Sequence, residues 1–213
     1  MTNVKYEIAR RAAQELPKGA IINLGIGIPT LIADCIDESE YVLHTENGLL
    51  GVTKIDEENI DPLIVNAGKI PVGEAVGSSY FSSADSFAMI RGGHVDVAVL
   101  GALQIDETGK IANWAVPGKD ILGVGGAMDL LEGAKKIIVT TMHTSNSGEP
   151  KIVKKCTYPI TSRRVADVIV TDIAVFKWRG NEYELVDLLG NATLEEVARK
   201  TEAHYRVASH LQQ

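Results

Sequence analysis

The 213-residue chain has the composition of an ordinary globular protein, with 45% hydrophobic and 23% charged residues, which argues against extended disorder. Its net charge of -7 disfavours a nucleic-acid-binding surface, because such surfaces are basic. Neither a signal core nor an apolar run of the roughly 20 residues that span a bilayer is found. Cys35 and Cys156 are far apart and outside any CxxC pattern, which favours a reducing compartment. We therefore expect one domain over residues 1–213, in the cytoplasm, with no nucleic-acid or membrane partner.

Helical and strand-like patterns alternate along the chain. Apolar residues at helical spacing predict a first helix over Val4–Leu16, stopped by Pro17 and Gly19. Further helices are predicted at Pro29–Ile36, Ser83–Ile90, Ala127–Ala134 and Leu194–Lys200. Short apolar runs predict strands at Ala20–Leu24, Tyr41–Thr45, Leu63–Val65, Val95–Leu100, Ile137–Thr141, Val168–Thr171 and Ile173–Trp178. This alternation predicts an α/β fold with an open, largely parallel sheet flanked by helices.

Common catalytic and metal-binding signatures are missing from the sequence. It contains no HExxH, no G-x-S-x-G elbow and no P-loop, so the usual metalloprotease, hydrolase and nucleotide-phosphate interpretations lack support. The acidic segment Ile55–Pro62 ends in proline and is typical of a solvated loop rather than a metal site. We therefore expect neither a metal nor a resident cofactor.

A glycine-rich turn follows the first predicted strand. Residues Asn23 to Pro29 join a strand end to a helix start through Gly25 and Gly27, whose backbone amides are able to meet an anion or an acyl oxygen. Thr30 stands where a dinucleotide fingerprint needs its third glycine, so that type of binding site is not indicated. A tight strand-to-helix turn without any ligand explains the local sequence equally well.

Two further turns carry candidate chemistry. Glu46 ends the second predicted strand just before Asn47-Gly48, and ligands of open α/β sheets bind at such strand ends. By local sequence alone an exposed turn acid is the simpler interpretation. Gly125 and Gly126 precede the predicted helix at Ala127, where they form either an oxyanion cradle or a flexible connection.

The order of these and other motifs resembles the beta subunit of 3-oxoacid CoA-transferases. The resemblance runs from about Arg10 to about Val207. It is carried by Asn23 to Pro29, Glu46-Asn47-Gly48, Asn66-Ala67-Gly68, Ser79-Tyr80-Phe81, Ser86 to His94, Ala112-Asn113-Trp114, Pro117-Gly118-Lys119 and Gly125-Gly126-Ala127-Met128-Asp129. A collinear series of this kind is specific, whereas the E-N-G triplet alone is not.

The resemblance implies a CoA-transferase (NagB/RpiA-like) fold and a set of roles. Glu46 becomes the nucleophile, and the amide of Gly126 stabilises the thioester oxyanion, with Gly125, Gly25 and Gly27 as further oxyanion or thioester contacts. Asn23 and Asn47 are candidates for substrate binding. The resemblance also implies a separate alpha subunit in a hetero-oligomer, such as α2β2, and CoA thioester as substrate rather than cofactor.

The implied reaction is the reversible transfer of CoA between an acyl-CoA and a short-chain carboxylic or 3-oxo acid such as acetoacetate, through a glutamyl-CoA thioester on Glu46. Two alternatives stay open: an acyl-CoA hydrolase on the same scaffold, and a module that binds CoA esters or sugar phosphates without turnover. The sequence departs from the family pattern at Thr45, Val52-Thr53-Lys54, Met142-His143 and Tyr158-Pro159-Ile160. These departures leave the pair of exchanged acids open.

Overall fold

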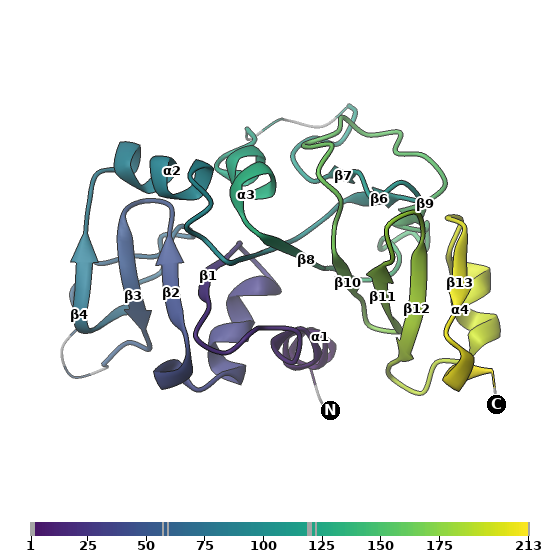
Figure 1. The fold of residues 1–213 in the computed structure, drawn as a ribbon, viewed down its shortest axis with the longest axis horizontal. Coiled ribbons are helices and arrows are strands. Elements are labelled where there is room, and N and C mark those ends of the chain that lie inside the picture. Colours follow the sequence, from purple (N-terminus) through teal and green to yellow (C-terminus); the bar gives the residue numbers. More distant parts are fainter. Residues whose placement is uncertain (1–2, 57, 59, 119–120, 122, 213) are drawn as a thin grey trace.

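The computed structural model describes residues 3–56, 58, 60–118, 121 and 123–212, and its frame is a ten-stranded sheet (Figure 1). The strand order is β13-β12-β11-β10-β8-β5-β1-β2-β3-β4. The bounds of these strands are β1 Ile21–Leu24, β2 Val42–Thr45, β3 Leu49–Thr53, β4 Gly73–Tyr80, β5 Val97–Leu100, β8 Lys136–Thr140, β10 Val168–Val170, β11 Ala174–Trp178, β12 Tyr183–Leu188 and β13 Tyr205–Val207. A separate small sheet has the order β7-β6-β9, with β6 at Gln104–Asp106, β7 at Ile111–Ala112 and β9 at Ile152–Val153.

The middle of the large sheet is parallel. Strands β2, β1, β5, β8 and β10 all pair in parallel, whereas β3 and β4 on one side and β11 and β12 on the other pair antiparallel. Every residue of β5 is buried, as expected for a parallel strand covered on both faces. The prediction of an α/β fold with an open, largely parallel sheet is confirmed.

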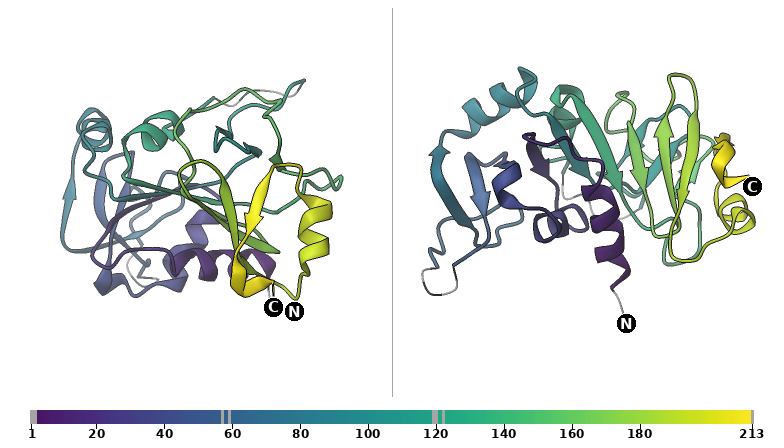
Figure 2. Two further views of the ribbon diagram at one scale, coloured as in Figure 1. Left: turned by 45° about the vertical axis from the view of Figure 1, so that its right-hand side comes forward. Right: turned by 60° about the horizontal axis from the view of Figure 1, so that its bottom comes forward.

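Helices cover both faces of the sheet. The α-helices are α1 Val4–Ala13, α2 Ser83–Arg91, α3 Ala127–Gly133 and α4 Leu194–Lys200, and the 3-10 helices are η1 Pro29–Cys35, η2 Glu38–Glu40 and η3 Ser209–Leu211. Helices α2 and α3 lie side by side at the upper edge of the sheet in Figure 1, and α1 lies well away from them in both figures (Figure 2). Alternate residues of β5 belong to two different apolar clusters, with Ala98 and Leu100 in one and Val97 and Val99 in the other.

Most of the predicted elements are present, with shifted ends. Helix α1 is shorter than predicted, because the chain after Ala13 continues in a turn in which Leu16 N donates to Ala13 O. The segment Pro29–Ile36 is helical as predicted but 3-10 in type. The predicted strand Leu63–Val65 is wrong, since only an isolated bridge between Val65 and Pro71 forms there.

The edge strands were not predicted from the sequence. Strand β4 contains two glycines and two serines in GEAVGSSY, a composition typical of loops, and it pairs only because β3 lies beside it. In the acidic segment Ile55–Pro62, the described residues from Asp56 to Pro62 are exposed, and Glu57 and Asn59 lie outside the described residues.

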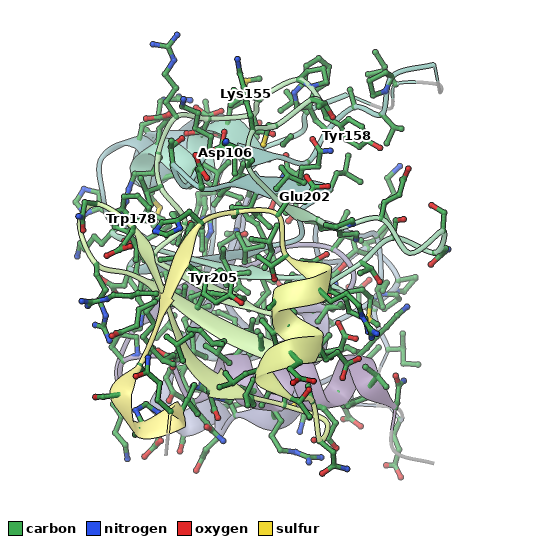
Figure 3. The ribbon with its side chains drawn as sticks, turned by 90° about the vertical axis from the view of Figure 1, so that its right-hand side faces the viewer. Asp106, Lys155, Tyr158, Trp178, Glu202 and Tyr205 are labelled. Carbon is green, nitrogen blue, oxygen red and sulfur yellow. The ribbon has the colours of Figure 1, made fainter. Side chains whose placement is uncertain are left out.

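The far end of the sheet is held by aromatic side chains. Figure 3 views the molecule from the β13 side, with α4 in front and Tyr205 on β13. The Tyr205 ring meets Phe176 edge-on with centroids 5.2 Å apart, and Trp178 meets Tyr183 in the same way at 5.0 Å. None of the helices in the described part of the chain is long and apolar enough to cross a membrane.

Candidate functional site

Three parallel strands deliver their carboxyl ends to one place. Register pairs Asn23 of β1 with His44 of β2, and Leu24 of β1 with Val99 of β5. The residues that follow these strands therefore emerge together at one edge of the sheet, which is where open α/β sheets bind ligands. That edge contains a pocket of about 380 Å³, near the lower end of the usual range for ligand sites.

The pocket combines one carboxylate with backbone, amide and apolar groups. Glu46 is the only ionisable side chain among the described residues that line it. The other lining residues are Asn23, Gly25, Ile26, Ala67, Leu100, Gly101, Ala102, Leu103, Asn113, Val124, Gly125, Gly126, Ala127 and Leu130. The set therefore fits a ligand with a polar reacting centre and an apolar portion.

Glu46 stands on a turn that has little freedom to move. It follows β2 and precedes β3, and Gly48 N donates to Thr45 O at 3.1 Å to close the turn. Gly48 has φ +119°, and a Cβ there would lie 2.1 Å from the carbonyl oxygen of Phe81. Only glycine fits this position, so Gly48 is a structural requirement of the turn. The turn thus holds the carboxylate at the strand end.

The Glu46 carboxylate is half-buried and unpaired. No group among the described residues donates a hydrogen bond to it or forms an ion pair with it. Gly126 lies directly against its side chain, since a Cβ at residue 126 would be 3.3 Å from Glu46 Cγ and 3.3 Å from Phe87 Cζ. The absence of a side chain at Gly126 is therefore what brings the main chain of the Gly125-Gly126 segment up to the carboxylate.

A chain of buried polar side chains leads from the pocket to α2. The Asn23 side chain is 1% exposed, and its Nδ2 donates to the carbonyl oxygen of His44 at 3.2 Å. Because that carbonyl only accepts, the amide orientation is fixed and Asn23 Nδ2 also donates to His44 Nδ1 at 3.2 Å. His44 Nε2 then carries the proton and donates to Ser86 Oγ at 3.0 Å. The Oδ1 of Asn23 is left without a protein partner beside the pocket.

Burial keeps His44 neutral. The ring is 2% exposed and stacks on Phe81 with centroids 6.0 Å apart. Desolvation lowers the pKa of His44 to about 4, so its imidazole is uncharged at neutral pH. His44 therefore contributes no positive charge next to Glu46, and it acts as a neutral link between Asn23 and Ser86.

The structure brings some of the candidate residues together and not others. Asn23, Gly25, Gly125 and Gly126 line the pocket with Glu46. Gly27 does not line the pocket. It is exposed and has φ +98°, so the backbone conformation of the turn accounts for glycine at this position. The Asn47 side chain donates to Val65 O at 2.8 Å and so ties down the segment that contains Ala67. The roles of these residues in binding or catalysis stay predictions.

Sequence reasoning missed the far wall of the pocket. Gly101 and Leu103 lie between β5 and β6, and Asn113, which the sequence analysis named only as part of a motif, directly follows β7. The predicted strand Val95–Leu100 could have indicated this wall. In a parallel sheet its carboxyl end lies at the same edge as the ends of the predicted strands Ala20–Leu24 and Tyr41–Thr45, so the residues after Leu100 were candidates too. Lys119, in the motif that begins at Pro117, lies outside the described residues. In the described part of the chain no group of three or more histidine, cysteine or acidic residues is placed to hold a metal.

Comparison with known proteins gives a consistent result. A family model described as Coenzyme A transferase matches residues 5–200. The chain is 47% identical over 205 residues to one subunit of the succinyl-CoA:3-ketoacid coenzyme A transferase of Helicobacter pylori strain J99, covering 96% of this chain and 99% of the relative. It is 48% identical over 207 residues to the acetate CoA-transferase subunit beta of Haemophilus influenzae, covering 97% and 93%.

A solved structure shares the fold. The acyl-CoA transferase apoenzyme of Escherichia coli O157:H7 superposes with a TM-score of 0.80 at 24% identity. The superposition covers 98% of this chain and 42% of that longer chain.

Proposed function

This chain belongs to the coenzyme A transferase family, and we propose that it supplies the nucleophile Glu46 of a hetero-oligomeric CoA-transferase. The enzyme exchanges CoA between an acyl-CoA and a short-chain carboxylic or 3-oxo acid such as acetoacetate. The observation that supports this most directly is the unpaired Glu46 carboxylate, which faces a pocket with Gly126 against its side chain.

The reaction begins at the carboxylate. A Glu46 oxygen attacks the carbonyl carbon of the acyl-CoA thioester; the C–O bond forms, the C–S bond breaks and CoA leaves as thiolate. The product on the enzyme is a mixed anhydride. The thiolate then attacks the Glu46 carbonyl carbon, the anhydride C–O bond breaks, and the donor acid departs as its carboxylate. Glu46 now carries CoA as a thioester, and an acceptor carboxylate runs the same steps in reverse.

A carboxylate suits this exchange better than a hydroxyl. Glutamate side chains are ionised at neutral pH, so the attack needs no general base. The neutral His44 therefore has no such role in this mechanism. The remaining requirement is to stabilise the oxyanions that form in each addition. The amides of Gly126 and Gly125 are the candidates in the pocket for this role, whereas the predicted role of the Gly25 amide is not supported, because Gly25 N already donates to Val99 O at 2.8 Å. Asn23, whose Nδ2 is already engaged, has its Oδ1 free to accept from a substrate group.

We assign the rest of the CoA site to a separate alpha subunit. A pocket of about 380 Å³ holds an acyl group and a thioester, but the pantetheine arm and nucleotide of CoA extend far beyond such a volume. The relatives in Helicobacter pylori and Haemophilus influenzae are each named as a single subunit of their enzyme, the latter as subunit beta. In the rat mitochondrial succinyl-CoA:3-ketoacid coenzyme A transferase 2A, the matching region is 41% of one longer chain. Separate subunits and one longer chain both fit an active site that is completed by residues outside the region matched by this chain.

Trapping of CoA on the enzyme tests the proposal. The chain is coexpressed with its alpha partner, incubated with acetoacetyl-CoA without an acceptor acid, and digested for mass spectrometry. We expect the mass of CoA on the peptide that contains Glu46, and none on that peptide from Glu46→Gln. An unmodified wild-type peptide under conditions that support exchange would refute the mechanism.

The same incubation separates the alternatives. A hydrolase releases free CoA continuously without an acceptor, whereas a transferase releases one equivalent of acetoacetate per site and keeps the CoA bound to Glu46. A module that only binds CoA esters shows no exchange activity and binds equally well after Glu46→Gln. We also expect the reaction to run in the cytoplasm, which is consistent with both cysteines being unpaired thiols.

A further inference from the structure

Gly101 is unusual among the glycines of this chain. All 20 glycines lie within the described residues, and Gly101 alone combines a φ outside the left-handed region with no atom within 4 Å of a built Cβ. Every other glycine has a positive φ, a close neighbour, or both. Neither backbone conformation nor packing therefore requires a glycine at this position.

The space beside Gly101 belongs to the pocket that Glu46 faces. Gly101 directly follows β5 and lines that pocket. The backbone of this wall is held by side-chain hydrogen bonds, because Asn113 Nδ2 donates to Gly101 O at 3.3 Å and Thr141 Oγ1 donates to Ala102 O at 3.1 Å. Thr161 Oγ1 in turn donates to Asn113 Oδ1 at 2.7 Å. The wall is thus a fixed surface, and the missing side chain leaves room that the backbone is not free to close.

The chemistry of this wall suits hydrocarbon. The residues that line the pocket with Gly101 include Leu100, Ala102, Leu103 and Leu130, whose side chains are apolar. Asn113 also lines it, but its amide is engaged by Gly101 O and by Thr161 Oγ1. Glu46 is the one charged side chain among the described lining residues. A saturated carbon chain loses no hydrogen bonds by lying against such a surface and gains from leaving water.

We propose that Gly101 is a specificity-determining residue whose missing side chain admits the carbon chain of the acyl group, and so sets the longest chain that reacts at Glu46. This rests on the proposed function, since it places the thioester carbonyl at Glu46 and runs the chain towards Gly101. The substrate class is an unbranched short-chain acyl group. Leu103 lines the same pocket and contributes a larger side chain to it.

Single-turnover reaction of the CoA-loaded complex with different acids tests the inference. The wild-type complex is first loaded on Glu46, and the loading is checked by mass spectrometry. Acetate, propionate, butyrate and hexanoate are then compared as acceptors by kcat/KM. For Gly101→Ala we expect the ratio of butyrate to acetate to fall about tenfold, because one added methyl group in an apolar pocket is worth at least that much. Gly101→Val should lower the ratio further.

The opposite change provides a matched control. Leu103→Ala removes bulk from the same wall, and Leu103 lies outside the buried core clusters, so its truncation opens the pocket without emptying the core. We expect this variant to raise the ratio of hexanoate to acetate. Each ratio is taken within one variant, so a general loss of activity cancels.

The outcomes separate this inference from the proposed function. Equal effects of Gly101→Ala on all four acids, or no effect, would overturn the inference while leaving the transferase reaction in place. If Gly101→Ala instead weakens binding of the alpha subunit in size-exclusion chromatography, the space is filled by the partner and the inference is wrong. Failure of the wild-type complex to load CoA on Glu46 would overturn the proposed function, and the acyl-chain assignment with it.

Discussion

Glu46 reaches the pocket from a tight turn, and this geometry makes the length of the Glu46 side chain critical. Because Gly48 is pinned against Phe81, the turn has no easy way to move forward and compensate for a shorter side chain. We expect Glu46→Asp to lower kcat/KM by on the order of a hundredfold, since one methylene displaces the attacking oxygen by roughly an ångström. Glu195→Asp, an exposed residue on α4, is the matched control and should leave the steady-state rate unchanged. A rate for Glu46→Asp near the wild-type value would contradict the assigned role.

A substitution at Gly126 tests the contact between Gly126 and the Glu46 side chain. Alanine at this position keeps the backbone N–H but places a methyl group 3.3 Å from both Glu46 Cγ and Phe87 Cζ. We expect Gly126→Ala to lower kcat by at least about tenfold through displacement of the carboxylate, with little change in thermal stability. Steady-state kinetics and a melting curve check this. An unchanged kcat would show that the carboxylate has room to retreat and that Gly126 is not kept for closeness to Glu46.

At the scale of elements, the distance between α2 and α3 is set by one glycine. A Cβ at Gly133 would lie 2.1 Å from the carbonyl oxygen of Ile90, so the two helices approach as closely as their backbones allow. Helix α3 begins just after Gly126, and its position therefore helps to fix that residue against Glu46. We expect Gly133→Ala to force the helices apart and destabilise the protein by about 1–3 kcal/mol in urea unfolding, with lower activity as a consequence.

The ion pair between the same helices is the control. Arg91 Nη1 and Asp129 Oδ1 lie 2.7 Å apart, but the Arg91 side chain is 57% exposed. Exposed pairs contribute about 0–1 kcal/mol, so Arg91→Ala should destabilise less than Gly133→Ala. If the two variants were equally destabilised, close packing at Gly133 would not be what holds α2 to α3.

For the whole molecule, two buried histidines predict how stability depends on pH. His44 is described above, and His143 is 1% exposed between Thr171 Oγ1 and Thr201 Oγ1, each 2.9 Å from a ring nitrogen. Burial lowers the pKa of each to about 4, whereas the pKa of a histidine in the unfolded chain stays near its ordinary value of 6.5. Between these values the unfolded state binds more protons, so stability is greatest above about pH 6.5 and falls as pH falls towards 4.

Urea unfolding at a series of pH values measures this dependence. The slope of unfolding free energy against pH reports the protons taken up on unfolding, and each histidine should contribute up to about one of them. His44→Gln and His143→Gln should each reduce the slope in this window, and the double variant should reduce it further. A slope that is unchanged in both single variants would show that carboxylates, rather than these histidines, dominate the acid sensitivity.

The middle of the fold could be predicted from the amino-acid sequence, and Glu46 could be identified there as a candidate for the reacting group. Apolar runs such as Val95–Leu100 are long enough and apolar enough to specify buried parallel strands without help from neighbours. The glycines after Glu46 and before Ala127 could be recognised in the sequence as turn positions, because turns and close backbone approaches restrict the residue type locally. The order of the motifs then indicated the family, which the comparisons confirm.

Features that depend on residues far apart in the sequence could not be predicted before the elements were placed in three dimensions. Strand β4 exists because β3 offers it hydrogen bonds, and Leu63–Val65 is no strand because it has only Pro71 as a partner. The link from Asn23 through His44 to Ser86 joins three elements, and the empty space at Gly101 is defined by atoms that surround it rather than by its neighbours in the chain. Local sequence specifies backbone preference and burial, but a pocket is the product of packing between elements, and its shape is fixed only when they meet.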